Sequence, residues 1–233
     1  MRVLFLLLTL LITPCLAQND WIPLFDGKTL KGWTQRNGLA TYRVEDGAIV
    51  GRTAKNSPNS FLCTNKAYCD FDLTFDVKVD PGLNSGVQVR SRSSKDYKDE
   101  RVHGPQVEIT VAPGPSGYIY GEATGRGWLS PKRDINDAYK NDQWNTFRVL
   151  AMGPRIQTWI NGKAVEDLTD EASSRCGFIG LQVHGVRDRG PFEVRWRNIK
   201  IKDLAPEKTE KSQEVQFTRA PDVQEKKKPQ RPR

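Results

Sequence analysis

The chain has little of the side chains on which most metal and redox centres depend. Its 233 residues include two histidines, four cysteines and two methionines. No two cysteines have the C-x-x-C spacing of a zinc or thiol-redox site, and no acidic cluster has the periodicity of a calcium loop. We therefore expect no cofactor and no dedicated metal site, while a divalent cation bound by scattered ligands stays open.

Long apolar runs are also missing, apart from one at the start of the chain. Residues 3–12 are apolar except for Thr9, follow Arg2, and lead to small residues at Cys15 and Ala17. This pattern predicts a signal peptide at residues 1–17, because the run is too short to span a bilayer. Lipid attachment through Cys15 is the less favoured alternative, since Pro14 stands where a small residue is usual. We expect a secreted or periplasmic protein without a transmembrane span.

Several enzyme and nucleic-acid motifs are absent as well. The sequence has no phosphate-binding loop, no serine nucleophile elbow and no nucleic-acid-binding module. The net charge is +8, and part of it lies in residues 205–233, which show no apolar periodicity. We expect this basic tail to be disordered and dispensable for folding, without a nucleic-acid partner.

Between these ends, residues 20–204 consist mainly of short alternating segments separated by turn residues. Residues 71–79 alternate apolar and polar side chains strictly, and Asp46-Gly47 and Asn161-Gly162 are hairpin turns. Helix candidates are few and short, at 134–139 and 169–174, and no strand-helix-strand rhythm indicates a parallel sheet. The pattern predicts one all-β domain, a two-sheet antiparallel sandwich of the jelly-roll type.

Three cysteines remain after the predicted cleavage. Cys63 and Cys69 flank a short polar stretch, so two readings stay open: a disulfide across a hairpin, or two unpaired buried thiols. Either reading leaves at least one unpaired thiol in the chain.

The most informative segments are three strands whose polar faces carry amides and ionisable groups. Because successive strand residues point to opposite faces, the polar members of each segment share one face. They are Gln88 and Arg90, Gln106 and Glu108, and Gln182 and His184. Arginine, glutamate, histidine and glutamine can hold hydroxyl groups and move protons, whereas an ordinary solvated strand carries lysine, threonine and serine. We expect the six side chains to converge on one concave face.

Two long polar loops, residues 92–104 and 121–141, interrupt the strand rhythm and are expected to form the rim of that face. Tyr120 and Trp128 are the candidates for stacking on a sugar ring, and Glu122, Arg126 and Tyr139 are further rim candidates. The other five tryptophans lie in strand-like or terminal segments and are expected in the core: Trp21, Trp33, Trp144, Trp159 and Trp196.

Six segments in order along the domain resemble one family. They are residues 21–33, which begin WIPLFDG, and residues 42–50, 68–73, 84–90, 180–184 and 197–201. Together they are similar to the 3-keto-disaccharide hydrolase domain. The resemblance implies a concanavalin-like jelly roll and an exported bacterial protein that acts on glycosides oxidised to a ketone at carbon 3. A sugar 3-dehydrogenase acting upstream would then be a partner.

A ketone at carbon 3 makes the hydrogen on carbon 2 acidic, so a base can remove it and the group on carbon 1 can leave. This chemistry needs a base, a cation for the enolate oxygen and an acid for the leaving group. We assign His184 and Glu108 to acid and base work, Arg90 to the enolate, and Gln88, Gln106 and Gln182 to sugar hydroxyls. The alternatives are a carbohydrate-binding module without catalysis and an envelope structural protein that uses its basic tail as a tether.

Overall fold

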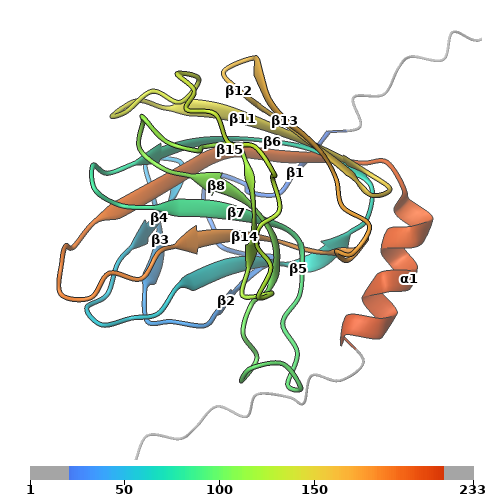
Figure 1. Cartoon of the computed structure of the whole chain (residues 1–233). Coiled ribbons are helices and arrows are strands. Elements are labelled where there is room, and N and C mark those ends of the chain that lie inside the picture. The colour runs from blue at the N-terminus through green and yellow to red at the C-terminus, as the bar shows by residue number, and fades with distance from the viewer. Residues whose placement is uncertain (1–20, 218–233) are drawn as a thin grey trace, which may run out of the picture.

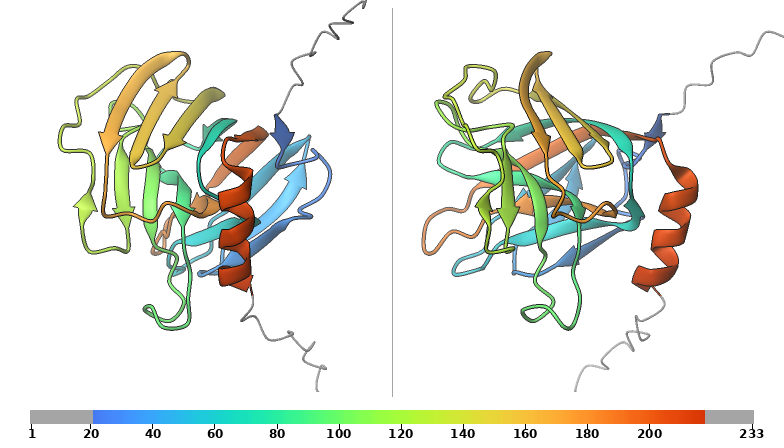
Figure 2. Two further views of the ribbon diagram at one scale, coloured as in Figure 1. Left: turned by 90° about the vertical axis from the view of Figure 1, so that its right-hand side faces the viewer. Right: turned by 45° about the vertical axis from the view of Figure 1, so that its right-hand side comes forward.

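Fifteen strands in two antiparallel sheets and a C-terminal helix make up residues 21–217, the part of the chain that the computed structural model describes (Figures 1 and 2). The eight-stranded sheet has the order β13 (Lys163–Thr169), β12 (Arg155–Ile160), β11 (Asn145–Met152), β6 (Phe71–Val79), β15 (Glu193–Asp203), β4 (Ala48–Arg52) and β3 (Thr41–Glu45), with β1 (Ile22–Pro23) also paired to β15. The seven-stranded sheet has the order β10 (Gly127–Trp128), β9 (Ile119–Glu122), β8 (Gly104–Ile109), β7 (Ser85–Ser91), β14 (Gly177–Val183), β5 (Ser60–Tyr68) and β2 (Trp33–Arg36). The predicted all-β sandwich is confirmed.

The core lies between the two sheets and follows the alternation of the strands. On β6 the odd-numbered residues from Phe71 to Val79 point inward and are buried, while the even-numbered ones face outward. Phe75 stacks on Phe147 of the neighbouring β11 with ring centroids 5.3 Å apart. Neither expected helix forms: residues 134–139 and 170–174 are irregular, and Thr169 is the last residue of β13.

The tryptophans divide between the core and the surface. Trp33 and Trp196 are buried in the core, as expected. Trp21, Trp144 and Trp159 are only half-buried, each with a cationic side chain over its ring. The expectation that these three belong to the core was wrong. The alternation of β11 and β12 turns Trp144 and Trp159 toward the outer face of the eight-stranded sheet, and Trp21 directly precedes β1.

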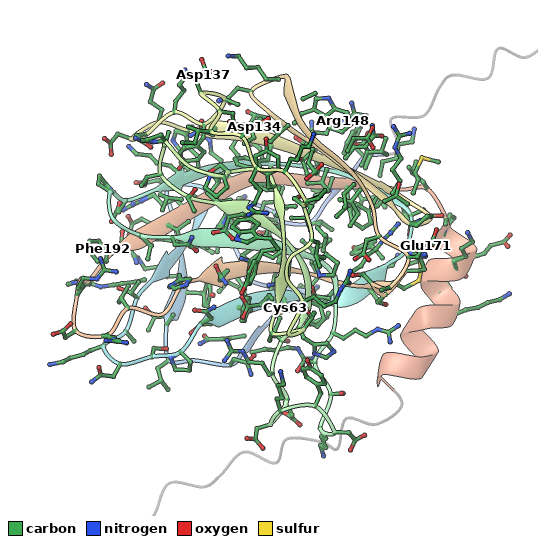
Figure 3. All side chains as sticks on the ribbon, in the orientation of Figure 1. Cys63, Asp134, Asp137, Arg148, Glu171 and Phe192 are labelled. Atoms are coloured by element: carbon green, nitrogen blue, oxygen red, sulfur yellow. A yellow bond between two sulfur atoms is a disulfide. The ribbon has the colours of Figure 1, made fainter. Side chains whose placement is uncertain are left out.

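The outer face of the seven-stranded sheet is covered. Every residue of β7 and β14 is buried, although each strand has one face toward the core and one away from it. On the outer face, Val102 from the end of the loop 92–103 packs with Phe61, Phe178 and Cys63, which is labelled in Figure 3. Polar side chains of these strands are therefore buried on that face as well.

One end of the sandwich is held by a disulfide. Cys69, which follows β5, is bonded to Cys176, which precedes β14, across a separation of 107 residues. Cys63 is an unpaired, fully buried thiol within β5. Both readings proposed for Cys63 and Cys69 were therefore wrong, since sequence spacing carries no information about so distant a partner.

The helix α1 (Pro206–Phe217) follows β15 and packs beside the end of β5 (Figure 2). Its Thr209 is fully buried, and the Thr209 hydroxyl oxygen accepts a hydrogen bond from the Cys69 backbone N–H at 3.3 Å. Lys208 lies 3.3 Å from the Asp70 carboxylate. The expectation of disorder from residue 205 onward was thus wrong for residues 206–217, because one buried hydroxyl docks a helix that lacks an apolar face. The predicted signal peptide and residues 218–233 lie outside the described residues.

Among residues 21–217, no helix is long and apolar enough to span a bilayer.

Thr209→Val should lower the free energy of unfolding by about 1 kcal/mol and the melting temperature by about 2–4 °C, because the buried Cys69 N–H loses its acceptor. Thermal unfolding followed by circular dichroism measures this change. The control is Thr169→Val at an exposed strand end, which should leave the melting temperature unchanged. Equal melting temperatures for all three proteins would mean that α1 does not support the fold.

Candidate functional site

A directed chain of hydrogen bonds crosses the outer face of the seven-stranded sheet. The Ser91 hydroxyl donates to the Gln88 side-chain carbonyl oxygen at 2.7 Å, and the Gln88 amide donates to that of Gln106 at 2.8 Å. The Gln106 amide in turn donates to Glu108 Oε2 at 3.0 Å, and the Asn84 amide donates to Glu108 Oε1 at 2.5 Å. Every donor points toward Glu108, so this relay, from Ser91 to Glu108 and Asn84, concentrates donor groups on one carboxyl group.

The strand register explains how the relay forms. Gln88 on β7 is directly opposite Gln106 on β8, and Gly86 is opposite Glu108. A Cβ atom at Gly86 would come within 2.5 Å of the Gln106 side chain. Only glycine at position 86 therefore leaves room for the amide that links Gln88 to Glu108.

Glu108 is a buried carboxyl group with a shifted affinity for its proton. Its side chain is 6% exposed. Burial raises the pKa of Glu108 above its usual value, and hydrogen bonds from Asn84 and Gln106 and the positive charge of His184 partly oppose the rise, while the Glu122 carboxylate adds to it. Glu108, Glu122 and His184 are consequently close enough to influence one another electrostatically.

His184 directly follows β14 and is half-buried. Its Nδ1 lies 2.8 Å from the Gly185 carbonyl oxygen. A carbonyl oxygen only accepts hydrogen bonds, so Nδ1 carries a proton, and whenever the ring is neutral its lone pair is on Nε2. The arrangement makes Nε2 the atom that can take a proton from a ligand.

A pocket of ≈350 Å³ opens beside His184. It lies between the turn 56–59, Arg101, and the segment of Gly185 and Arg187. Glu122, which is 6% exposed, accepts hydrogen bonds from Arg101 at 3.1 Å and Asn59 at 3.4 Å. Asn59 also accepts from the Gly185 backbone N–H at 2.9 Å. The pocket lining therefore combines cationic and amide side chains, and Arg101 and Asn59 link it to the buried Glu122 carboxylate.

Two buried polar groups on this side of the sandwich have no hydrogen-bond partner among the described residues. They are the side-chain amide of Gln182, through both its oxygen and its nitrogen, and Nε of Arg101. Gln182 is opposite Gly86 on β7, next to the strand pair that carries Glu108. An unsatisfied buried polar group is costly, so each group needs a partner that the described residues do not supply.

Aromatic side chains lie at the outer edge of this sheet. Tyr120 on β9 is opposite Gln106 on one side and Trp128 of β10 on the other. The Tyr120 and Trp128 rings meet edge to face with centroids 5.3 Å apart, and both residues are half-buried. The strand register thus places both rings beside the relay, while their role as a stacking surface for a sugar stays a prediction.

Arg90 is the exception among the predicted site residues. Its guanidinium donates to the backbone oxygens of Cys69 and Gly153, both at 2.6 Å, and to Asp70 at 2.9 Å. Burial lowers the pKa of Arg90 to about 10, and Asp70 partly offsets the effect, so the group keeps its charge. The prediction that Arg90 converges with Glu108 and His184 was wrong.

A β-bulge causes this difference. Gln88 and Ser91 of β7 are opposite Gly180 and Phe178 of β14, so β7 has one extra residue between them, and Arg90 has φ = 49°. The bulge resets the alternation and gives Ser91 the position on the outer face that Arg90 was expected to occupy. The alternation of polar and apolar residues in the sequence does not show that β7 contains this extra residue.

Two rim expectations also need correction. Arg126 pairs with Asp170 at 2.8 Å instead of facing the site, and Tyr139 is buried in the core against Phe147. These side chains leave the rim because their loops turn toward other packing partners.

Four residues of this region were not predicted from the sequence, namely Arg101, Asn59, Asn84 and Ser91, and Glu122 was predicted only as a rim residue. The position of Glu122 was the easiest to predict, since it is two residues beyond Tyr120 and shares its strand face. Arg101 and Asn59 come from loops, where no periodicity indicates which way a side chain points. Among the described residues, no three histidine, cysteine, aspartate or glutamate side chains group as metal ligands.

The amide-rich, carboxylate-bearing face and the family match together identify a carbohydrate-active protein. Residues 20–202 match the family model of the 3-keto-alpha-glucoside-1,2-lyase-like domain. The chain therefore belongs to this family, which confirms the resemblance seen in the sequence. No curated protein matches the chain significantly.

Solved structures share the fold. Two proteins from Parabacteroides distasonis, both provisionally designated glycosyl hydrolases, superimpose with TM-scores of 0.59 and 0.52 at 22% and 25% identity. The alignments cover 81% and 80% of this chain, and 98% and 100% of the two proteins. The carbohydrate-binding module CBM66 from Bacillus subtilis has a TM-score of 0.53 at 19% identity over 73% of this chain and 95% of the module.

Arg90→Lys should lower the free energy of unfolding by about 3 kcal/mol, because an ammonium group cannot reproduce the fork that binds Cys69, Gly153 and Asp70. Turnover by the folded fraction should stay within about threefold of wild type, as expected for a group outside the chemistry. Urea titration and steady-state kinetics measure the two quantities.

The matched control is Arg155→Lys, which changes an exposed pair with Asp167 and should cost less than about 1 kcal/mol. A large loss of turnover in Arg90→Lys without a loss of stability would return Arg90 to the catalytic site.

Proposed function

We propose that this protein is exported and cleaves 3-keto-glycosides by elimination at carbons 1 and 2, followed by addition of water. The observation that carries the proposal is the buried Glu108 carboxyl group, held by convergent donors within electrostatic reach of His184, whose Nε2 is free to take a proton. The family description as 3-keto-alpha-glucoside-1,2-lyase-like supports the same chemistry.

The elimination would proceed as follows. His184 Nε2 takes the acidic proton from carbon 2, and the electron pair moves toward the carbon-3 carbonyl to form an enolate. The enolate then re-forms the ketone as the bond from carbon 1 to the leaving oxygen breaks, and Glu108 donates a proton to that oxygen. Water subsequently adds across the new carbon 1–carbon 2 double bond, which gives net hydrolysis.

Other groups of the site would bind and stabilise. Arg101, and not Arg90, would be the cation that stabilises the enolate oxygen. It lines the pocket, and its buried Nε has no partner among the described residues. The unsatisfied Gln182 amide, with Gln88 and Gln106 behind it, would bind sugar hydroxyls. Tyr120 and Trp128 would contact a ring at the edge of the sheet.

The substrate implies an earlier reaction, since a glycoside becomes acidic at carbon 2 only after oxidation at carbon 3. An upstream sugar 3-dehydrogenase would supply the ketone. The predicted signal peptide and the disulfide Cys69–Cys176 support a secreted or periplasmic location, where disulfides persist.

Glu108→Gln should reduce turnover of a 3-keto-disaccharide at least about a hundredfold, because its leaving alkoxide needs an acid. The same variant should lose less than about tenfold on a nitrophenyl 3-keto-glycoside, whose leaving group needs no proton. His184→Ala should lose at least about a hundredfold on both substrates, and added imidazole should restore part of the activity. The control is Glu45→Gln on the opposite sheet, which should behave as wild type.

The pH dependence follows from the pKa of Glu108. Because burial raises that pKa, Glu108 keeps its proton to a higher pH than an ordinary glutamate, and activity on the disaccharide should fall as the pH rises through it. This alkaline limb should be missing from the nitrophenyl reaction of Glu108→Gln. If the exported chain binds oligosaccharides but turns over no 3-keto-glycoside, the protein is a binding module and the proposal fails.

A further inference from the structure

A second pocket lies on the opposite side of the sandwich, over the outer face of the eight-stranded sheet. Its volume is ≈410 Å³, and β1, β6, β11 and β15 border it. Arg148, labelled in Figure 3, belongs to this sheet, whereas Cys63 in the same view belongs to the sheet of the candidate catalytic site. The two pockets thus open on different faces of the domain.

A β-bulge shapes this pocket. Arg197 and Lys200 of β15 are opposite Asp76 and Thr74 of β6, so β15 contains one extra residue between them. Asn198 within the bulge adopts φ = 53°, while Ile199 turns into the core. Bulges re-aim side chains and are frequent beside binding sites, so this distortion is the expected way to bring Asn198 to the outer face.

Asp76 organises the polar wall of the pocket. Its carboxylate accepts hydrogen bonds from the Thr146 hydroxyl and the Asn198 amide, both at 2.7 Å, and from Arg197 Nε at 3.4 Å. Because a carboxylate only accepts, the Asn198 nitrogen must face Asp76, and the Asn198 side-chain oxygen is left for a ligand. The orientation of Asn198 is therefore fixed before anything binds.

Three polar groups at this pocket have no hydrogen-bond or ion-pair partner within residues 21–217: the Thr74 hydroxyl, the Asn198 side-chain oxygen and the Lys200 ammonium group. They offer both donors and acceptors. Pro23, Phe25 and Ile199 supply an apolar part of the lining. A ligand that complements this lining must combine hydroxyl groups with apolar C–H faces.

Two tryptophan rings contact cationic side chains of β15 next to the pocket. Lys200 lies over the Trp21 ring at 5.5 Å, and Arg197 lies over the Trp144 ring at 4.1 Å. Both tryptophans are half-buried, which places aromatic surface within reach of a ligand that extends beyond the pocket. Aromatic edges beside mixed polar groups suit the alternating polar and apolar surface of a sugar chain.

We propose that this pocket is a second glycan-binding site, which holds one pyranose residue of an oligosaccharide chain through Thr74, Asn198 and Lys200. The Asp76 carboxylate disfavours phosphate and other anions, and the polar wall disfavours a purely apolar ligand. A chain held here would raise the local concentration of glycan near the protein without occupying the site around Glu108.

Isothermal titration of the exported chain with cellohexaose, laminarihexaose and maltohexaose tests the proposal. We expect at least one hexaose to bind, and the double variant Thr74→Val, Lys200→Met to weaken that binding at least about tenfold, since two polar contacts are lost. Asn198→Gly is a second variant, because glycine tolerates φ = 53° and removes only the amide. The controls are Thr169→Val and Lys31→Met at exposed positions, which should bind as wild type.

The same variants separate this site from the proposed catalytic one. Thr74→Val, Lys200→Met should leave the melting temperature and any turnover of 3-keto-glycosides unchanged, whereas Glu108→Gln should leave hexaose affinity at this pocket unchanged. The proposal is overturned if no hexaose binds the wild-type chain, or if both pocket variants bind as tightly as wild type.

Discussion

The burial of polar side chains on the outer face of the seven-stranded sheet is the constraint on which the site depends. A strand face without a cover would leave glutamines and glutamate in water, where their hydrogen bonds to one another contribute little. Gln88, Gln106 and Gln182 are at most 2% exposed, so each amide must find its partner within the protein. The relay that ends at Glu108 satisfies this requirement and leaves Gln182 as the amide without a partner among the described residues.

The same burial gives Glu108 its chemical character. A carboxyl group on an open sheet would be ionised at neutral pH, and its pKa would lie near the usual value. Desolvation raises that pKa, while the donors that converge on Glu108 limit the rise. Burial and hydrogen bonding thus act in opposite directions on one proton, and the strand register that brings Gln106 to Glu108 contributes to the balance between them.

The sequence predicts those features that depend on neighbouring residues, and it does not predict those that depend on residues far apart in the chain. Strand alternation is local, so the sandwich and the shared face of Gln88, Gln106, Glu108 and Gln182 were predictable. A bulge is one extra residue in that alternation, and it moved Arg90 to the far side of the strand without any mark in the composition.

Long-range partners were the second limit. The bond from Cys69 to Cys176 joins residues 107 positions apart, and Arg101 reaches Glu122 from a loop with no periodicity. The helix α1 was missed for a related reason, because Thr209 is a polar residue that becomes buried only when the Cys69 N–H is present to donate to its hydroxyl. Such contacts follow from the completed fold and not from the segments that make them.

The two proposed binding regions depend on opposite faces of one sandwich, and each uses a departure from regular strand geometry. In β7 the bulge removes Arg90 from the outer face and admits Ser91, while in β15 the bulge brings Asn198 to the surface. The regular residues on either side of each bulge continue to fill the common core. Local irregularity therefore changes what each face can bind without changing how the sheets pack.

The position of the disulfide has a consequence for how the protein could be altered. Cys69–Cys176, the Arg90–Asp70 pair and α1 all gather where β5 ends and β14 begins, whereas Asn59, Asn84 and His184 lie at the other ends of β5, β7 and β14. The stabilising contacts and the candidate site residues thus lie at opposite ends of the same strands. Selection or engineering could raise the heat tolerance of the domain at the first end, or diversify its ligand preference at the second, with little conflict between the two.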